Sequence, residues 1–201
     1  MLSKGIIISI QGWSVSTTEE ITIEVANAGA VAIRTDKKIN SRIPIIGLKK
    51  EKVIERKDYP YITPSIEDVK DIEKWTKLIA VDYRKINKNI AVISEYAKHK
   101  GLIIIADIGS IDDYENIIEN EYYHSYIATT LSVLYKIDYK PDFVLIEELQ
   151  QLECKNIIAE GNFSNRHDVE KVLNSGVNNV CIGSAITDIY KNTKKYTSIK
   201  F

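Results

Sequence analysis

Residues 156–186 read NIIAEGNFSNRHDVEKVLNSGVNNVCIGSAI, and this stretch indicates the fold of the chain. Its two ends carry short apolar runs, 157–159 and 180–182, of the length of a buried strand. Between them, residues 165–175 place apolar side chains at helical spacing, and Gly176 follows as a natural helix stop. The stretch therefore predicts a strand, a helix and a second strand, which together form a βαβ unit.

Both strands of this unit end in glycine, the first at Glu160-Gly161 and the second at Gly183-Ser184. In parallel α/β folds, glycine at a strand end lets backbone N–H groups approach a ligand, and phosphate is the ligand most often held in this way. These residues are therefore candidates for binding an anion. The alternative is that the glycines only form tight turns.

The composition is that of an ordinary globular chain. Its 201 residues suffice for one sizeable domain, and we expect residues 1–201 to form a single one. A hydrophobic content of 44% and a net charge of -1 give no basic face for nucleic acid or for an anionic membrane. We expect neither as a partner.

The cysteines and the N-terminus point to a cytoplasmic protein. Cys154 and Cys181 are too few for a disulfide framework, and we expect buried free thiols, although one disulfide stays open as an alternative. Met1 to Lys4 lead directly into a strand, with no long apolar segment and no export signal.

Along the whole chain, eight apolar runs alternate with helical segments or short linkers, as parallel strands covered on both faces do. This pattern predicts an α/β fold, a (β/α)8 TIM barrel. Residues 35–42 are too short for an ordinary crossover helix, so the second helix is expected to be shortened or missing. A doubly wound open sheet is the alternative, but Gln11-Gly12-Trp13 is not the dinucleotide-binding fingerprint.

Six strands end in a polar side chain, and the carboxyl ends of barrel strands form one functional face. The six residues are Gln11, Arg34, Lys50, Asp82, Asp107 and Glu160. Period-two alternation predicts that Ile158 lies inside with Glu160, that Ala32 and Ala30 lie inside with Arg34, and that Ile105 lies inside with Asp107. The same rule turns Ile157 and Ala159 toward the helices. The alternative is that the polar ends are merely solvated.

Such a set permits proton transfer at a carbon next to a carbonyl group. A partly buried Lys50 beside Arg34 would have a lowered pKa and act as a base, and Glu160 would act on the other face of the substrate. Arg34 and Gln11 could stabilise the developing negative charge. The three histidines are isolated and no ligand spacing is present, so no metal site is expected.

The chain resembles the N-acetylmannosamine-6-phosphate 2-epimerase family of sialic acid catabolism. The matching segments occur in order along nearly the whole chain. They are Ile8-Ser9-Ile10-Gln11, residues 29–34, 44–50 and 61–64, Ile79-Ala80-Val81-Asp82, Ala106-Asp107-Ile108, residues 129–132, residues 158–162 and residues 183–187.

The resemblance implies a cofactor-independent isomerase that inverts C2 of N-acetylmannosamine 6-phosphate and forms N-acetylglucosamine 6-phosphate. It places the family's catalytic lysine on Lys50 and its catalytic glutamate on Glu160. Substrate-binding positions fall on Gln11, Arg34, Asp107, Thr129, Gly161, Asn162, Gly183 and Ser184. Family members are typically dimers, so a homodimer that acts on a small phosphosugar is expected.

Several positions depart from the family. Asp188 stands where the family usually has an arginine suited to phosphate, and Asn162 replaces another common arginine. Residues 82–84 read Asp-Tyr-Arg in place of Asp-Ala-Thr, and residues 133–135 replace Gly-Tyr-Thr. Two alternatives therefore stay open. One is a catalytically silent phosphosugar-binding barrel, and the other is an enzyme for a different phosphosugar whose phosphate is held by Arg84, Lys136 or Lys191.

Overall fold

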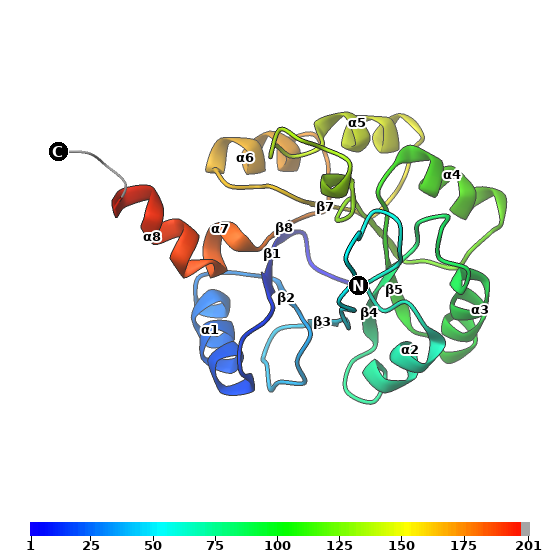
Figure 1. The fold of residues 1–201 in the computed structure, drawn as a ribbon, viewed down its shortest axis with the longest axis horizontal. Helices are drawn as coiled ribbons and strands as arrows, with labels where there is room; N and C mark the ends of the chain where they lie inside the picture. The colour runs from blue at the N-terminus through cyan, green and yellow to red at the C-terminus, as the bar shows by residue number, and fades with distance from the viewer. Residues whose placement is uncertain (198–201) are drawn as a thin grey trace.

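Eight short strands pair in sequence order and close into a parallel barrel in the computed structural model, which describes residues 1–197 (Figure 1). The last strand pairs with the first, Ile7 opposite Cys181, so the sheet has no free edge. The predicted (β/α)8 barrel is confirmed. The strands are β1 Gly5–Ile10, β2 Ala32–Thr35, β3 Ile45–Gly47, β4 Leu78–Asp82, β5 Ile103–Asp107, β6 Tyr126–Ala128, β7 Ile157–Glu160 and β8 Asn179–Ile182.

Helices surround the barrel (Figure 1). They are α1 Val15–Asn27, α2 Ile66–Ile72, α3 Ile90–Lys100, α4 Ile111–Glu119, the 3-10 turn η1 Ser132–Leu134, α5 Phe143–Gln151, α6 Arg166–Asn174, α7 Ser184–Thr187 and α8 Ile189–Thr197. Residues 36–44, all of them described, link β2 to β3 without a helix. The expected loss of the second helix is therefore confirmed.

The alternation of side chains along the strands divides the core in two. Ile158, Ala32 and Ile105 belong to the cluster inside the barrel, while Ile157 and Ala159 pack beneath the helices. These orientations confirm the period-two prediction. The expectation for Ala30 is wrong: β2 begins only at Ala32, and Ala30 packs with the outer cluster under α1.

Two boundaries differ from the sequence prediction. The helix α2 begins after Ser65, whose hydroxyl accepts from the Asp68 N–H, whereas the sequence predicts a start at Thr63-Pro64. Thr63 has a φ of 45° and uses its hydroxyl to accept from the Lys49 N–H, so it belongs to the loop after β3. The strand expected over 126–131 ends at Ala128.

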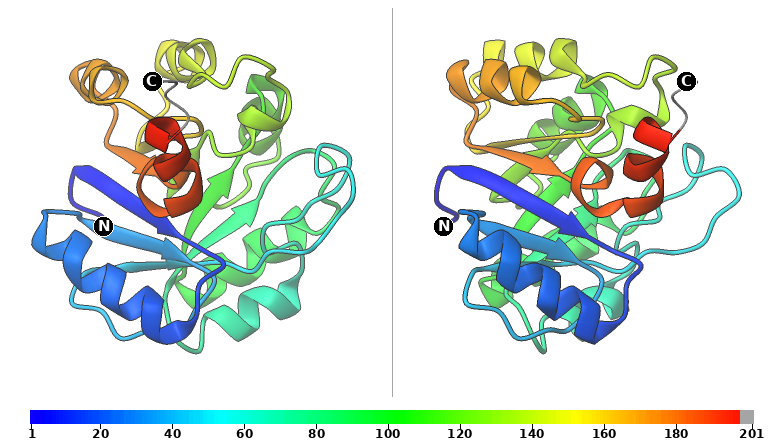
Figure 2. Two further views of the ribbon diagram at one scale, coloured as in Figure 1. Left: turned by 60° about the vertical axis from the view of Figure 1, so that its left-hand side comes forward. Right: turned by 90° about the vertical axis from the view of Figure 1, so that its left-hand side faces the viewer.

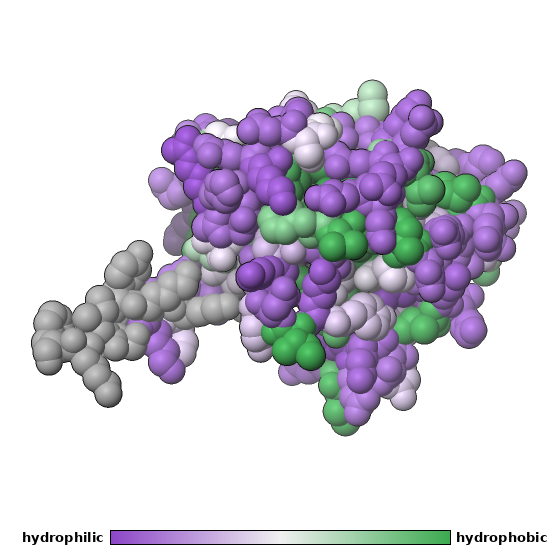
Figure 3. Space-filling model, turned by 90° about the horizontal axis from the view of Figure 1, so that it is seen from above, coloured by the Kyte–Doolittle hydropathy of each residue, from purple (hydrophilic) through white to green (hydrophobic). Residues whose placement is uncertain are grey.

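The two cysteines are free, as predicted. No helix that the structure describes is both long and apolar enough to span a bilayer. The face over α5 and α6 is mostly hydrophilic, with small hydrophobic groups between the polar ones (Figure 3). The expected polar C-terminal segment includes α8, and its last residues, 198–201, lie outside the described part of the chain.

All strands point toward one end of the barrel. The loop after β3, α7 and α8 gather at that end (Figure 2, right). The carboxyl ends of all eight strands open there, so the polar strand-end residues are brought to one face.

Candidate active site

A buried ionic cluster lies at the carboxyl ends of β2, β5 and β7. The Arg34 guanidinium donates to both carboxylate oxygens of Asp107, over 2.9 Å and 2.5 Å, and its Nη1 lies 3.0 Å from Glu160 Oε2. Arg34 and Asp107 have exposed fractions of only 1% and 0%. Charges this deeply buried persist only when they are paired, so Arg34 and Asp107 hold each other in place.

Thr130 completes this cluster. Its hydroxyl lies 2.7 Å from Asp107 Oδ1 and 3.1 Å from Glu160 Oε2, so it can donate to either, and it accepts from Arg34 Nη1 over 3.3 Å. The sequence prediction of site residues missed Thr130. The signal that finds it is parity, because Tyr126 and Ala128 of β6 lie inside the barrel and the next position of that phase is 130.

Thr129, the threonine predicted to bind substrate, contacts the backbone of β7. It is fully buried, its hydroxyl donates to the Glu160 carbonyl over 2.9 Å, and it accepts from the Glu160 N–H over 3.0 Å. These two bonds extend the β6–β7 pairing by one step. Thr129 therefore fixes the backbone of Glu160, while Thr130 contacts its carboxylate.

A cavity of about 540 Å³ opens above the cluster, at the barrel mouth. It brings together five of the predicted residues, which come from β1, β7, β8 and the loop after β3. They are Gln11, Lys50, Glu160, Gly183 and Ser184. The cavity is also lined by residues that the sequence did not single out, namely Ser9, Gly12, Trp13, Thr187, Ile189 and Tyr190.

The remaining predicted residues lie beneath or beside this cavity. Gly161 has a φ of 109°, and a Cβ placed there would lie 2.5 Å from Val133 Cγ1. Asn162 also has a positive φ, of 57°, and its amide donates to the Lys140 carbonyl over 3.4 Å. These two residues shape the turn that follows Glu160.

The surroundings of Lys50 and Glu160 move their pKa values in opposite directions. Burial of the Lys50 ammonium lowers its pKa, and so do the cations of Arg34 and Arg56, against the opposing effect of Glu160. Burial of the Glu160 carboxyl raises its pKa, which Arg34 opposes and Asp107 reinforces. The Lys50 residue as a whole is exposed and lines the open cavity. The site thus shifts the pKa of a lysine and the pKa of a glutamate toward neutral pH.

The candidate phosphate end of the cavity is formed by Gly183 and Ser184, where β8 passes into α7. Asp188 lines the same cavity. The Thr187 hydroxyl points back into the turn, with the carbonyls of Ser9 and Gly183 as acceptors at 3.4 Å and 3.2 Å.

Two of the three cations that the sequence offers as replacements for a phosphate-binding arginine are engaged elsewhere. Arg84 is buried and pairs with Asp82 over 2.6 Å, and Lys136 pairs with Asp142 over 2.6 Å. The side chain of Lys191 is not among those described. Arg84 and Lys136 therefore do not line the cavity. Within residues 1–197, no cluster of three or more His, Cys, Asp or Glu side chains suited to a metal ion is found.

Comparisons with known proteins agree with this architecture. A solved N-acetylmannosamine-6-phosphate 2-epimerase from Clostridium perfringens superimposes with a TM-score of 0.85 at 27% identity, covering 99% of this chain and 95% of that chain. The tryptophan synthase α-subunit of Pyrococcus furiosus, at 14% identity and a TM-score of 0.68, shares the barrel fold alone.

The sequence comparisons agree with the structural match. A relative from Clostridioides difficile (strain 630) is 35% identical over 84% of this chain and 80% of its own length, and one from Caldanaerobacter subterraneus is 32% identical over 98% and 91%. Both carry the name "Putative N-acetylmannosamine-6-phosphate 2-epimerase". Residues 19–200 match the family model described as "Putative N-acetylmannosamine-6-phosphate epimerase". The chain belongs to the N-acetylmannosamine-6-phosphate epimerase family.

Proposed function

We propose that this protein is a cofactor-independent epimerase that inverts C2 of N-acetylmannosamine 6-phosphate and yields N-acetylglucosamine 6-phosphate. The observation that carries this proposal is that Lys50 and Glu160 line the same cavity. The pKa of Lys50 is lowered and that of Glu160 is raised, so both shift toward neutral pH. Family membership supports the choice of substrate.

In the proposed mechanism, Lys50 is the base. The C2 proton is acidic only when C1 is a carbonyl, so the open-chain sugar is the reacting form. Neutral Lys50 takes the proton, and the electron pair of the C2–H bond moves toward C1 and leaves negative charge on the carbonyl oxygen. The lowered pKa of Lys50 increases its neutral fraction near pH 7.

Glu160 then returns a proton to the opposite face of C2. A carboxyl group with a raised pKa retains the proton that it must give, and Thr130 and Arg34 hold the carboxyl in position. The protonated Lys50 stabilises the negative oxygen until the new C–H bond forms. Exchange with solvent restores the proton to Glu160 and removes it from Lys50 after each turnover.

The ends of the cavity suggest how the sugar lies. We assign the phosphate to the backbone around Gly183 and Ser184, next to the turn at Gly161 and Asn162, and the hydroxyl groups to Gln11. The Gln11 amide already donates to the Ser9 hydroxyl over 2.7 Å, which orients its carbonyl oxygen. Arg34 and Asp107 support Glu160 from below.

The test is proton NMR of the protein with N-acetylmannosamine 6-phosphate in deuterated water, beside a Lys50→Ala control. We expect N-acetylglucosamine 6-phosphate that carries deuterium at C2, with a rate lower by about 10²- to 10⁴-fold in the control, the contribution typical of a general base. Folded wild-type protein that gives neither product nor exchange would contradict the proposal.

A second candidate function is favoured by Asp188. Asp188 lines the phosphate end of the cavity, and an acidic residue there disfavours a phosphate dianion, which favours a related phosphosugar whose phosphate lies elsewhere. Isomerisation of other amino-sugar phosphates, at a higher kcat/KM than that of N-acetylmannosamine 6-phosphate, would support this candidate. We also retain a cytoplasmic location and a homodimer as proposals.

A further inference from the structure

We propose that Arg84 is a positioning residue that holds Lys50 in the cavity by fixing the loop formed by residues 51–60. This inference rests on the proposed role of Lys50 and assigns a function to a residue that lies outside the cavity. The hydrogen bonds of Arg84 reach two separate parts of the chain.

All five N–H groups of Arg84 have acceptors. Nε and Nη2 donate to the Asp82 carboxylate, over 2.9 Å and 2.6 Å. The other donors reach three backbone carbonyls of the loop, those of Arg56, Lys57 and Tyr59, at 2.8 Å, 3.2 Å and 2.5 Å. Arg84 and Asp82 have exposed fractions of 1% and 0%. A planar guanidinium fork can hold a carboxylate and three carbonyls together, which a lysine ammonium cannot do.

Asp82 holds the returning end of the same loop. Its Oδ2 accepts from the Tyr61 N–H over 3.2 Å, and its own N–H donates to the Ile62 carbonyl over 2.8 Å. The loop tip is therefore bound to Arg84 and its end to Asp82, so both contacts depend on one buried ion pair.

Lys50 is paired directly with this fixed segment. It forms an antiparallel bridge with Ile62, flanked by hydrogen bonds from the Glu51 N–H to the Tyr61 carbonyl and from the Thr63 N–H to the Lys49 carbonyl. The buried Tyr61 ring lies 5.9 Å from both Lys50 Nζ and Arg84 Cζ. A shift of residues 61–63 would therefore move both the backbone and the side chain of Lys50.

The loop also sets the electrostatic surroundings of Lys50. Arg34 on β2, Asp107 on β5 and Glu160 on β7 face it from the barrel, and Arg56 faces it from the loop, next to the Tyr61 ring. The Arg56 carbonyl is one of the three that Arg84 holds. Release of the loop would remove a cation from the vicinity of Lys50 and raise the pKa of Lys50.

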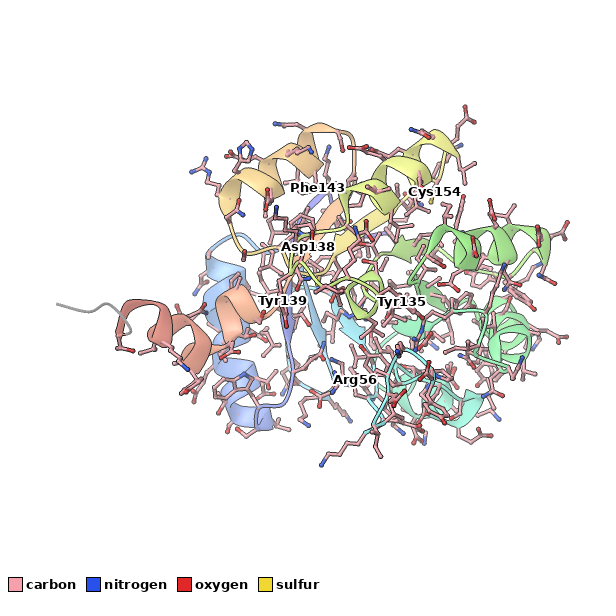
Figure 4. The ribbon with its side chains drawn as sticks, turned by 45° about the horizontal axis from the view of Figure 1, so that its top comes forward. Arg56, Tyr135, Asp138, Tyr139, Phe143 and Cys154 are labelled. Atoms are coloured by element: carbon pink, nitrogen blue, oxygen red, sulfur yellow. The ribbon has the colours of Figure 1, made fainter. Side chains whose placement is uncertain are left out.

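A second contact closes over the loop from the segment after β6. The Tyr135 hydroxyl donates to the Lys57 carbonyl over 3.2 Å and lies 3.4 Å from Arg84 Nη1. Figure 4 labels Arg56 and Tyr135, which come from these two segments at the barrel mouth. Tyr135 and Arg84 thus act on the same loop from two different segments.

The test compares Arg84→Lys with a matched control, Tyr83→Phe. Arg84→Lys leaves a cation beside Asp82 but removes the guanidinium hydrogen bonds to the loop carbonyls. Tyr83→Phe removes the neighbouring buried hydroxyl, which donates to the Tyr123 carbonyl over 2.9 Å on the other side of β4. The control variant therefore loses a buried hydrogen bond and some stability, but the hydrogen bonds that hold the loop are unchanged.

Three measurements apply to each variant. They are kcat and KM for N-acetylmannosamine 6-phosphate across pH, the rate of tryptic cleavage at Lys52, Arg56 and Lys57, and the ¹⁵N NMR titration of the Lys50 ammonium. For Arg84→Lys we expect kcat to fall by roughly 10- to 100-fold with little change in KM, the effect of a misplaced catalytic group. We also expect faster cleavage in the loop and a Lys50 titration at higher pH. Tyr83→Phe should show none of the three changes.

A lower Tm for Arg84→Lys, together with a wild-type kcat, Lys50 titration and cleavage rate, would overturn the proposal and leave a purely structural role. If Arg84→Lys does not fold, the double variant Asp82→Asn with Arg84→Met, which removes both buried charges, undergoes the same measurements. If the wild-type protein does not epimerise the sugar, the proposed function fails, and the cleavage and titration experiments still decide the role of Arg84.

Discussion

Arg34 shares its single positive charge between two carboxylates, Asp107 and Glu160. The two shortest bonds of the guanidinium go to Asp107, so Arg34 interacts more strongly with Asp107 than with Glu160. The excess negative charge, together with burial, raises the pKa of Glu160. A carboxyl group whose pKa is raised at the mouth of a barrel is a candidate for giving a proton to a substrate.

The raised pKa predicts how Glu160→Gln changes stability with pH. The folded state binds the Glu160 proton more tightly than the unfolded chain, whose carboxyl has the usual pKa near 4.5. Stability is therefore lost as pH rises from that value through the folded pKa. We expect the Tm of Glu160→Gln to match that of the wild type at acid pH and to exceed it at neutral pH.

Calorimetric scans of both proteins from acid to neutral pH check this prediction. Epimerase activity measured on the same samples should fall in Glu160→Gln by about 10²- to 10⁴-fold. A variant that is less stable than the wild type at neutral pH would show that the ion pair with Arg34 outweighs the burial of the carboxylate.

Asp188 predicts a change in substrate affinity. Asp188 lines the cavity together with Gly183 and Ser184, so an acidic residue stands near a phosphate bound there. Removal of one such charge by Asp188→Asn should lower KM by about fivefold, or ~1 kcal/mol for charges a few ångströms apart in a water-like medium. Kinetics at low and high salt provide the check, because the gain should shrink as salt rises. An unchanged KM at low salt would place the phosphate elsewhere.

At the scale of elements, the turn between β7 and α6 is formed by close packing against the segment after β6. Gly161 combines a φ of 109° with a site where a Cβ would meet Val133 Cγ1 at 2.5 Å. Gly29, at the end of α1, has a similar φ of 100°, and a Cβ added there would meet no atom within 4 Å. Substitution of Gly29 therefore tests backbone strain alone, whereas substitution of Gly161 tests backbone strain together with steric crowding.

We expect Gly29→Ala to lose about 1–3 kcal/mol from the strained φ alone. In Gly161→Ala the free energy of unfolding should fall by roughly a further 1–3 kcal/mol, because the added methyl group overpacks against Val133. Urea unfolding of both variants measures the difference, and the addition of Val133→Ala to Gly161→Ala should recover the second part only. Equal losses in the two single variants would mean that Val133 moves aside without cost.

At the scale of the whole molecule, the barrel closes although one of its helices is missing. Ile33 pairs directly with Ile45 across the β2–β3 step, and the ladder continues to β8 and back to β1. The closed ladder satisfies the backbone hydrogen bonds of the strands, so residues 36–44 need only connect two neighbours. The site depends on strands and loops and is not affected by the lost helix.

The expected homodimer is also a property of the whole molecule. Helix α8 projects from the barrel end (Figure 1), and its first residues, Ile189 and Tyr190, have exposed fractions of 61% and 75%. Apolar side chains exposed at this level gain from burial against a partner. We expect twice the chain mass in light scattering after size exclusion, and monomers for Ile189→Asp with Tyr190→Asp. A wild-type monomer at micromolar concentration would contradict the expectation.

The sequence by itself determined the barrel and the residues at its mouth. Continuous apolar runs with polar ends are properties of single strands, and the side-chain period of two follows from strand geometry, so both can be read locally. Glu160, Arg34 and Asp107 could be found in this way, whereas Lys50, expected at a strand end, lies in the loop after β3, which ends at Gly47. The inward phase of β6 also indicates Thr130, once the strand boundary is known to be Ala128.

Only the tertiary structure decided which partners these residues have. The sequence does not indicate that Arg84 pairs with Asp82 and holds three loop carbonyls, or that Asp188 enters the same cavity as Lys50. The contacts of Arg84 with the loop, and the cavity that Asp188 shares with Lys50, join segments that are distant in sequence, through loops whose path depends on packing. The strand ends specify which groups the site contains, and the loops between them decide how those groups are charged, paired and aimed.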